Sequence, residues 1–295
     1  MRKEKKLMRR LALWSLCLVL LASPARAETI NVVASFSILA DFVKNVGGDK
    51  VNVTSLVGPN SDVHVYTPAP SDARTIATAK LVVINGFGLE GWLPRLLVAS
   101  ASMTPIAVAT KGIAPLRLGS DSDPHAWQSV ANAKIYVTNI RDVLATVDPA
   151  DAGTFDANAA RYLAKLDALD TEVKEAIAKI PPERRKLITT HNAFGYLAEA
   201  YGISFIAPSG VSTEAEPSAH DIAEIIHQTK TEKIPAVFLE NISDDRLIGR
   251  VAAETGARVG GTLFSDSLTD EKGAAPTYID LVRHNIKVLT SALGN

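Results

Sequence analysis

Three histidines and one aspartate are the residues of this chain whose types best suit an ion-binding site. They are His64 in GPNSDVHVYTPAP, His125 in SDPHAW, His191 at the end of KLITTH and Asp266 in LFSDSL. Three imidazoles and one carboxylate are a recognised ligand set for a divalent transition metal, and neutral imidazole suits zinc in particular. Successive members lie more than 60 residues apart, so the sequence contains no compact metal motif. Spacing alone therefore does not establish a site, because a single histidine near a strand end is more often a polar cleft residue.

The elements that must position these side chains alternate along the chain. Short runs rich in β-branched residues predict strands. These runs cover residues 29–36, 51–57, 81–85 and 105–109, then 186–191, 203–208, 236–241 and 259–264. Amphipathic stretches between them predict helices, and this alternation is typical of βαβ units on parallel sheets. The predicted fold class is α/β, with two lobes that are each a mostly parallel sheet flanked by helices.

Ligands of open α/β sheets bind outside the carboxyl ends of the strands. His64 follows the second predicted strand, His125 lies in the loop beyond the fourth, and His191 closes the fifth. Asp266 follows the last predicted strand. Each lobe thus contributes two of the four side chains, and we expect them to converge in the cleft between the lobes.

A long amphipathic helix is predicted between the lobes, over residues 149–180. Its apolar positions step by three and four residues and are Phe155, Ala159, Tyr162, Leu166, Leu169, Val173, Ile177 and Ile180. Two prolines, at 181–182, end the pattern. Such a helix is about 40 to 45 Å long, enough to span both lobes. Because a helical connector bends less readily than a flexible linker, we expect small lobe motions.

The amino-terminal residues predict export. Residues 1–10 are basic, residues 11–22 are apolar, and Ala25-Arg26-Ala27 fits an A-x-A cleavage site, which is the pattern of a secretory signal peptide. The apolar run is too short to cross a bilayer comfortably, and no later segment reaches about 18 uninterrupted apolar residues. We therefore expect a cleavable signal peptide and no transmembrane helix.

Cleavage defines the expected domains and the charge of the mature chain. The domains are a signal peptide at 1–27, an amino-terminal lobe at 28–148, the linking helix at 149–180 and a carboxy-terminal lobe at 181–295. The single cysteine, Cys17, lies in the leader after Leu16 rather than after a small residue, which argues against lipid attachment. Removing the leader's seven Lys/Arg and one Glu leaves 24 basic and 31 acidic residues, a net charge of -7. This charge attracts cations and gives no support for binding to nucleic acid.

Four segments of the chain resemble the metal-binding solute-binding proteins of zinc and manganese ABC importers. They are LVGPNSDVHVYTPAPSDARTIATAKLVVINGFGLEGWLPRL, DPHAWQSVANAKIYVTNIRDVLATVDP, THNAFGYLAEAYG and AVFLENISDDRLIGRVAAETGARVGGTLFSDSL, collinear across nearly the whole mature chain. The resemblance implies a two-lobed periplasmic receptor, not an enzyme, with a rigid backbone helix. It further implies one metal bound in the cleft and delivered to a membrane permease with its cytoplasmic ATPase, and we expect a monomer. His64, His125, His191 and Asp266 fall on the family's four ligand positions.

The choice of metal depends on the third ligand position. The resemblance implies that manganese receptors commonly have a carboxylate there, where this sequence has His191. Three nitrogen donors with one or two oxygens favour Zn²⁺, with Mn²⁺ as the alternative. The histidine-rich loop of many zinc receptors is absent, since residues 65–124 contain no histidine. Gln128-Ser129 stand where the family often has an acidic residue. This difference affects the expected residues around the ligands and not the assignment of His125 as a ligand.

Three further carboxylates and one glycine motif have open or plain interpretations. Glu240 could orient a ligand imidazole, as carboxylates behind metal ligands do, or could cap a turn or pair between the lobes. Asp62 and Asp123 each precede a ligand histidine by two residues and predict turn caps. Residues 86–91 match G-x-G-x-x-G, but no acidic residue follows about 20 positions on, so we interpret the motif as a glycine turn.

Two other function classes are alternatives to the metal receptor. A secreted zinc hydrolase keeps one coordination position open for water beside a general base, for which Glu240 is the candidate. No HExxH motif accompanies it, and four protein ligands predict a closed site instead. An adhesin built on the same fold is not distinguished by the surface sequence.

Overall fold

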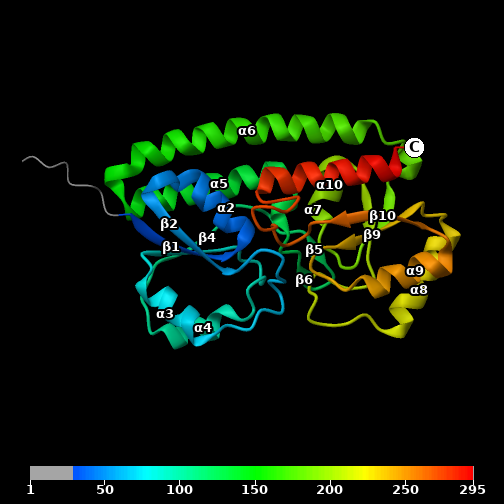
Figure 1. Cartoon of the computed structure of the whole chain (residues 1–295), viewed down its shortest axis with the longest axis horizontal. Helices are drawn as coiled ribbons and strands as arrows, with labels where there is room; N and C mark the ends of the chain where they lie inside the picture. The colour runs from blue at the N-terminus through cyan, green and yellow to red at the C-terminus, as the bar shows by residue number, and fades with distance from the viewer. Residues whose placement is uncertain (1–28, 295) are drawn as a thin grey trace, which may run out of the picture.

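Two four-stranded parallel sheets form the framework of the chain in the computed structural model, which describes residues 29–294 (Figure 1). The predicted signal peptide lies outside these residues. The first sheet has the order β2-β1-β3-β4, with β1 (Ile30–Phe36), β2 (Val51–Val57), β3 (Leu81–Ile84) and β4 (Ile106–Val108). The second has the order β10-β9-β7-β8, with β7 (Lys186–Ile188), β8 (Ser204–Ile206), β9 (Ala236–Glu240) and β10 (Arg258–Leu263). The predicted α/β class is confirmed.

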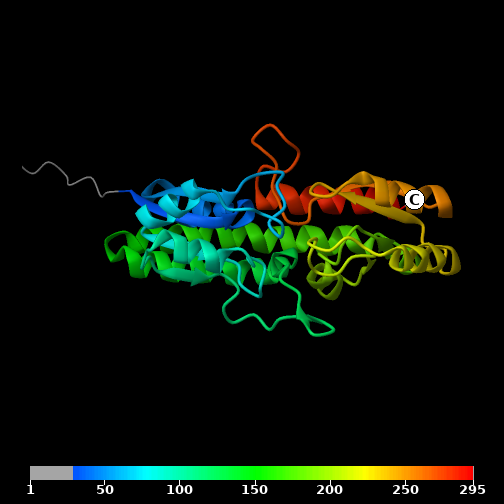
Figure 2. The same ribbon diagram turned by 90° about the horizontal axis from the view of Figure 1, so that it is seen from below.

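Helices cover both faces of each sheet. On one side lie α3 (Pro70–Thr78) and α4 (Leu93–Ser100) of the first lobe, with α8 (Ala219–Thr231) and α9 (Asp245–Thr255) of the second. The opposite side carries α2 (Ser37–Gly47), α5 (Val130–Val147), α6 (Ala152–Ala178) and α10 (Tyr278–Leu293). A short helix, α7 (Gly195–Tyr201), follows β7, and a small antiparallel hairpin of β5 (Arg117–Leu118) and β6 (Asp121–Ser122) lies in a loop that protrudes in Figure 2.

The long helix predicted between the lobes is α6, which runs past both sheets in Figure 1. It begins at Ala152 rather than at 149, because Pro149–Asp151 forms a 3₁₀ turn, and it ends at Ala178. Its 27 residues make it about 40 Å long. All eight apolar positions predicted to be buried are buried; seven lie in α6, and Ile180 follows its end. α5 and α10 pack beside it, which the sequence interpretation did not predict.

One hydrophobic core extends through both lobes beneath this helical layer. Phe42 of α2 packs edge-on against Tyr136, Tyr162 and Tyr278, which belong to α5, α6 and α10. Smaller apolar clusters lie under α3 and α4 and under α8 and α9. Within residues 29–294, no helix is both long enough and apolar enough to cross a membrane.

Candidate metal centre

The four residues selected from the sequence meet at one place between the two sheets. His64 lies in the loop after β2, and His125 directly precedes the 3₁₀ turn Ala126–Gln128 that leads into α5. His191 follows β7 by three residues and Asp266 follows β10 by three. One ligand atom from each of the four lies within 4.8 Å of the others. The structure therefore brings together all four, two from each lobe.

Four of the distances between donor atoms are close to those of a small tetrahedral site, and the whole set of four donors lies within 4.8 Å. Nε2 of His64 lies 3.3 Å from Nε2 of His125 and 3.4 Å from Oδ2 of Asp266. Oδ1 of Asp266 lies 3.5 Å from Nε2 of His125, and its Oδ2 lies 3.2 Å from Nε2 of His191. Nitrogen and oxygen ligands at zinc-like bond lengths in tetrahedral geometry are separated by about 3.3 to 3.4 Å. A single ion with zinc-like bond lengths can therefore bind donors at these separations.

The site is buried, and its carboxylate faces the three imidazoles. His125, His191 and Asp266 are 0% exposed, and His64 is 5% exposed. Apart from the three imidazoles, no group in the described range 29–294 donates a hydrogen bond to either oxygen of Asp266. Burying an ionised carboxylate is costly, so buried charges are normally paired or bound to a metal. A buried carboxylate that faces only imidazole nitrogens is the arrangement expected of a cation site.

Electrostatics keep Asp266 ionised in spite of its burial. Burial raises the pKa of Asp266, but the imidazoles of His125 and His191 outweigh this effect and hold the pKa well below its usual range. Burial lowers the pKa of His191, yet the carboxylates of Glu240 and Asp266 raise it well above its usual value. A proton on His191 is therefore the natural competitor of a metal ion at this site.

Glu240 stands directly behind His191. Its Oε2 lies 2.7 Å from Nδ1 of His191, which leaves Nε2 directed at Asp266. Its Oε1 accepts the backbone amides of Thr190 and His191, at 2.7 and 3.0 Å. These two amides therefore bond the carboxylate instead of a neighbouring strand. As a result β7 ends at Ile188, whereas the sequence predicted a strand that continues to His191. Of the two interpretations of Glu240, the geometry supports the one in which it orients an imidazole.

Asp123 orients the imidazole of His125 as Glu240 orients that of His191. The sequence predicted only a turn cap at this position. Its Oδ1 accepts the His125 amide at 2.9 Å, as a turn cap does, and also lies 2.8 Å from Nδ1 of the ring. Trp127 and Gln128 donate to the carbonyl oxygen of Ser265, the residue before Asp266, at 2.9 and 2.7 Å. These contacts between the lobes could not be read from local sequence, because the partners are about 140 residues apart, at separations of 138 and 137.

The glycine motif at 86–91 carries a protein carboxylate where a phosphate would bind. Oε1 of Glu90 accepts the amide of Asn85 at 2.6 Å and the hydroxyl of Ser35 at 2.7 Å, and its Oε2 accepts the amide of Gly86 at 3.2 Å. Gly86 adopts φ 90°, which favours glycine. The interpretation as a glycine turn fits this arrangement.

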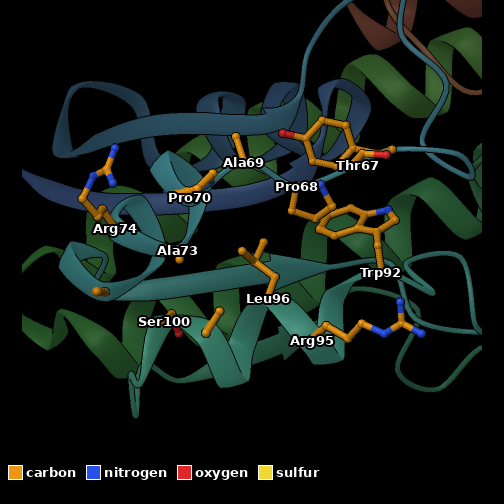
Figure 3. Close-up of a pocket in the computed structure, with 13 residues that line it drawn as sticks. Thr67, Pro68, Ala69, Pro70, Ala73, Arg74, Trp92, Arg95, Leu96 and Ser100 are labelled. Atoms are coloured by element: carbon orange, nitrogen blue, oxygen red, sulfur yellow. The ribbon is translucent and has the colours of Figure 1, made fainter.

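A larger cavity lies outside the centre, between α3 and α4 (Figure 3). Its volume is about 670 Å³, and its walls include Pro68, Trp92 and Leu96 with Arg74 and Arg95. The residues that line it, all within the described part of the chain, include no histidine, cysteine, aspartate or glutamate. It therefore offers no ligands to a cation, although it is larger than the cavity beside His191, which is about 540 Å³.

Known proteins match the chain along most of its length. Residues 32–292 match the family model described as zinc-uptake complex component A, periplasmic. The chain is 37% identical to the iron-binding protein YfeA of Yersinia pestis over 273 residues, or 91% of this chain and 88% of that protein. It is 33% identical to the manganese-binding lipoprotein MntA of Halalkalibacterium halodurans over 267 residues, which cover 90% of this chain and 89% of that protein.

Solved structures agree with these matches. The periplasmic zinc binding protein TroA from Treponema pallidum superposes with a TM-score of 0.87 at 30% identity, covering 90% of this chain and 100% of that one. A Mn-bound periplasmic metal binding protein from Candidatus Liberibacter asiaticus gives a TM-score of 0.81 at 34% identity, with the same coverage. With its α/β fold, its buried donors and its match across residues 32–292, this chain belongs to the family of metal-binding substrate-binding proteins of ABC transporters.

Proposed function

We propose that this protein is a zinc receptor that binds one Zn²⁺ through His64, His125, His191 and Asp266. The observation that carries the proposal is the convergence of four buried donor atoms within 4.8 Å, with both Asp266 oxygens free of other partners. Zinc is the substrate of this receptor and not a catalyst. Four protein ligands leave little reason for the open coordination position that a hydrolytic zinc requires.

The donor set supports zinc over harder metals. Three imidazole nitrogens and one carboxylate oxygen match the ligands that zinc prefers, whereas manganese prefers oxygen donors. The spacings of 3.2 to 3.5 Å between donors also suit tetrahedral zinc. The carboxylates of Asp123 and Glu240 fix two of the imidazoles from behind, as second carboxylates do at many zinc sites.

Manganese is the second candidate, and one observation favours it. Both oxygens of Asp266 face imidazole nitrogens, so the carboxylate can bind through two atoms and supply a five-donor set. Relatives of the chain are named for iron and manganese, and the name of TroA specifies zinc. The names of relatives therefore do not select the metal, and the donor types carry the proposal.

The deciding experiment measures the native metal and its coordination. Affinity alone is a weak criterion, because zinc binds more tightly than manganese at almost any site of this kind. The protein is purified from its own cells without added metal, and its metal content is measured by elemental analysis. X-ray absorption then gives the coordination shell, for which we expect zinc with four donors at about 2.0 to 2.1 Å. Manganese with five or six donors would refute the zinc assignment and keep the receptor.

The location and the transport partners follow from the same proposal. The signal peptide at 1–27 directs the chain to the periplasm, where it delivers its ion to a membrane permease driven by a cytoplasmic ATPase. MntA is named a lipoprotein, whereas Leu16 before Cys17 argues against lipidation here. Mass spectrometry of the exported protein should find an unmodified amino terminus at Glu28. A diacylglyceryl group on Cys17 would overturn this expectation.

A further inference from the structure

We propose that Thr213 is a positioning residue for metal binding, and that its hydroxyl holds His64 in the ligand set by acting across the cleft through Asp62. Thr213 lies in the loop between β8 and α8 of the second lobe, and Asp62 lies in the loop after β2 of the first. The inference rests on the proposed function and adds to it one contact between the lobes, the hydrogen bond from Thr213 to Asp62.

His64 is the least restrained of the three imidazoles. Nδ1 of His125 contacts Asp123 at 2.8 Å, and Nδ1 of His191 contacts Glu240 at 2.7 Å. Among residues 29–294, no hydrogen bond to Nδ1 of His64 is found. His64 is also the only one of the three with measurable exposure, at 5%. Its ring is therefore placed mainly by the backbone that carries it.

That backbone is held by one carboxylate with two partners. Oδ1 of Asp62 accepts the amide of His64 at 2.8 Å, and Oδ2 of Asp62 accepts the hydroxyl of Thr213 at 2.6 Å. Hydrogen bonds to a carboxylate are shorter and stronger than those between neutral groups. The position of the His64 backbone is thereby coupled to a residue of the opposite lobe.

The loop that carries Asp62 contacts the second lobe at two further places, since the amides of Asn60 and Ser61 donate to the segment next to Asp266, at 2.9 and 3.3 Å. Neither of these contacts reaches His64 or its backbone amide, which Asp62 holds. Asp62 and Thr213 instead line the 540 Å³ cavity that also reaches His191. An ion that leaves through this cavity passes the Asp62 to Thr213 hydrogen bond. Loss of this bond frees the ligand nearest to solvent, so the ion dissociates faster.

The test compares three variants by stopped-flow release of Zn²⁺ to an excess of chelator. Thr213→Val removes the hydroxyl and keeps the shape, and it should raise the dissociation rate at least about tenfold, the lower end of the effect of one hydrogen bond to a charged group. Thr213→Ser keeps the hydroxyl and should restore the wild-type rate. Thr171→Val is the matched control, because its hydroxyl donates to the Asp167 carbonyl of the same helix, on the exposed side of α6.

A double-mutant cycle separates positioning from a general loosening of the fold. In a His64→Ala background, Thr213→Val should change the dissociation rate less than twofold, because the ligand through which it acts is gone. An equal increase in both backgrounds would overturn the proposal, and so would a wild-type rate for Thr213→Val alone. A wild-type protein that binds no zinc would instead overturn the proposed function.

Discussion

Replacing Glu240 with glutamine tests whether a buried carboxylate makes His191 a metal ligand. Glutamine has nearly the same shape but presents one oxygen and one NH₂ group. If its oxygen stays on the amides of Thr190 and His191, which bond Oε1 at 2.7 and 3.0 Å, the NH₂ faces Nδ1 of the ring. Nδ1 must then accept, and the ring proton moves to Nε2, the atom that faces Asp266. If the group turns over, its NH₂ faces two backbone donors.

Either orientation of the glutamine amide weakens metal binding, and the size of the effect can be estimated. A buried donor that faces another donor is destabilised by about 1 to 3 kcal/mol. Substitutions of the partners behind metal ligands typically weaken metal binding by about 10- to 100-fold, which is the same range of free energy. We therefore expect Glu240→Gln to raise the dissociation constant for Zn²⁺ about 10- to 100-fold near pH 8.

The variant should also change the pH dependence of binding. Burial lowers the pKa of His191, but Glu240 and Asp266 raise it well above 6.5, so the wild-type ring holds a proton that the ion must displace. Zinc affinity of the wild type should therefore fall as the pH falls, from above pH 6.5 downward. Removing one of the two anions lowers the pKa of His191, and the decline begins at a lower pH. The affinity gap between the two proteins should narrow in acid.

Competition with a chromophoric zinc chelator between about pH 8 and about pH 5.5 measures both effects. Glu254→Gln is the matched control, because it removes the same charge from an exposed pair with Arg250 on α9. Wild-type affinity at pH 8 together with an unchanged pH profile in Glu240→Gln would refute the role assigned to this carboxylate. A wild-type affinity that stays flat from about pH 7.5 to about pH 5.5 would count against imidazole ligation itself.

Three further predictions concern selectivity, stability and motion. His191→Glu should shift relative affinity from zinc toward manganese by adding a hard oxygen donor; an unchanged ratio in competitive titration would show that position 191 is not the selector. Burial raises the pKa of Asp41 to about 6, against the hydrogen bonds from Tyr278 and Tyr162. The raised pKa of Asp41 favours folding in acid, and this stability is lost as the pH rises from about 4 to about 6. Urea unfolding with chelator present should therefore favour Asp41→Asn by about 2 kcal/mol more at pH 7 than at pH 4. Small-angle scattering should give nearly the same radius of gyration with and without zinc, because α5, α6 and α10 bridge the lobes; a marked expansion on metal removal would contradict this.

The elements with strong periodicity could be predicted from the sequence. Every position predicted for the buried face of the long helix is buried. This prediction was possible because apolar residues recur every three or four positions in a helix that packs against a core. The candidate ligands could be selected for a related reason, since parallel strands bring their carboxyl ends to common edges. His64, His125, His191 and Asp266 each follow such an end or lie in the loop beyond it.

The contacts behind the ligands could not be predicted, because they join residues that are remote in sequence. Thr213 reaches Asp62 across a separation of 151 residues, and Glu240 reaches His191 across 49. No local pattern specifies such pairs, which depend on how the two sheets are placed. The end of β7 was misjudged for the same reason, since a side chain from β9 takes the amides that a longer strand would have used.

The restraints on the three imidazoles suggest an order for ion release. The carboxylates of Asp123 and Glu240 are buried. They contact Nδ1 of His125 and of His191, respectively, on the side of each ring away from the site. Asp62 is half-buried and holds His64 only through its backbone, with Thr213 on the other side of the cleft. Loss of the Thr213 to Asp62 hydrogen bond therefore loosens the His64 restraint and leaves the other two unchanged. The ion would leave by losing His64 first, while two imidazoles and Asp266 remain able to rebind it.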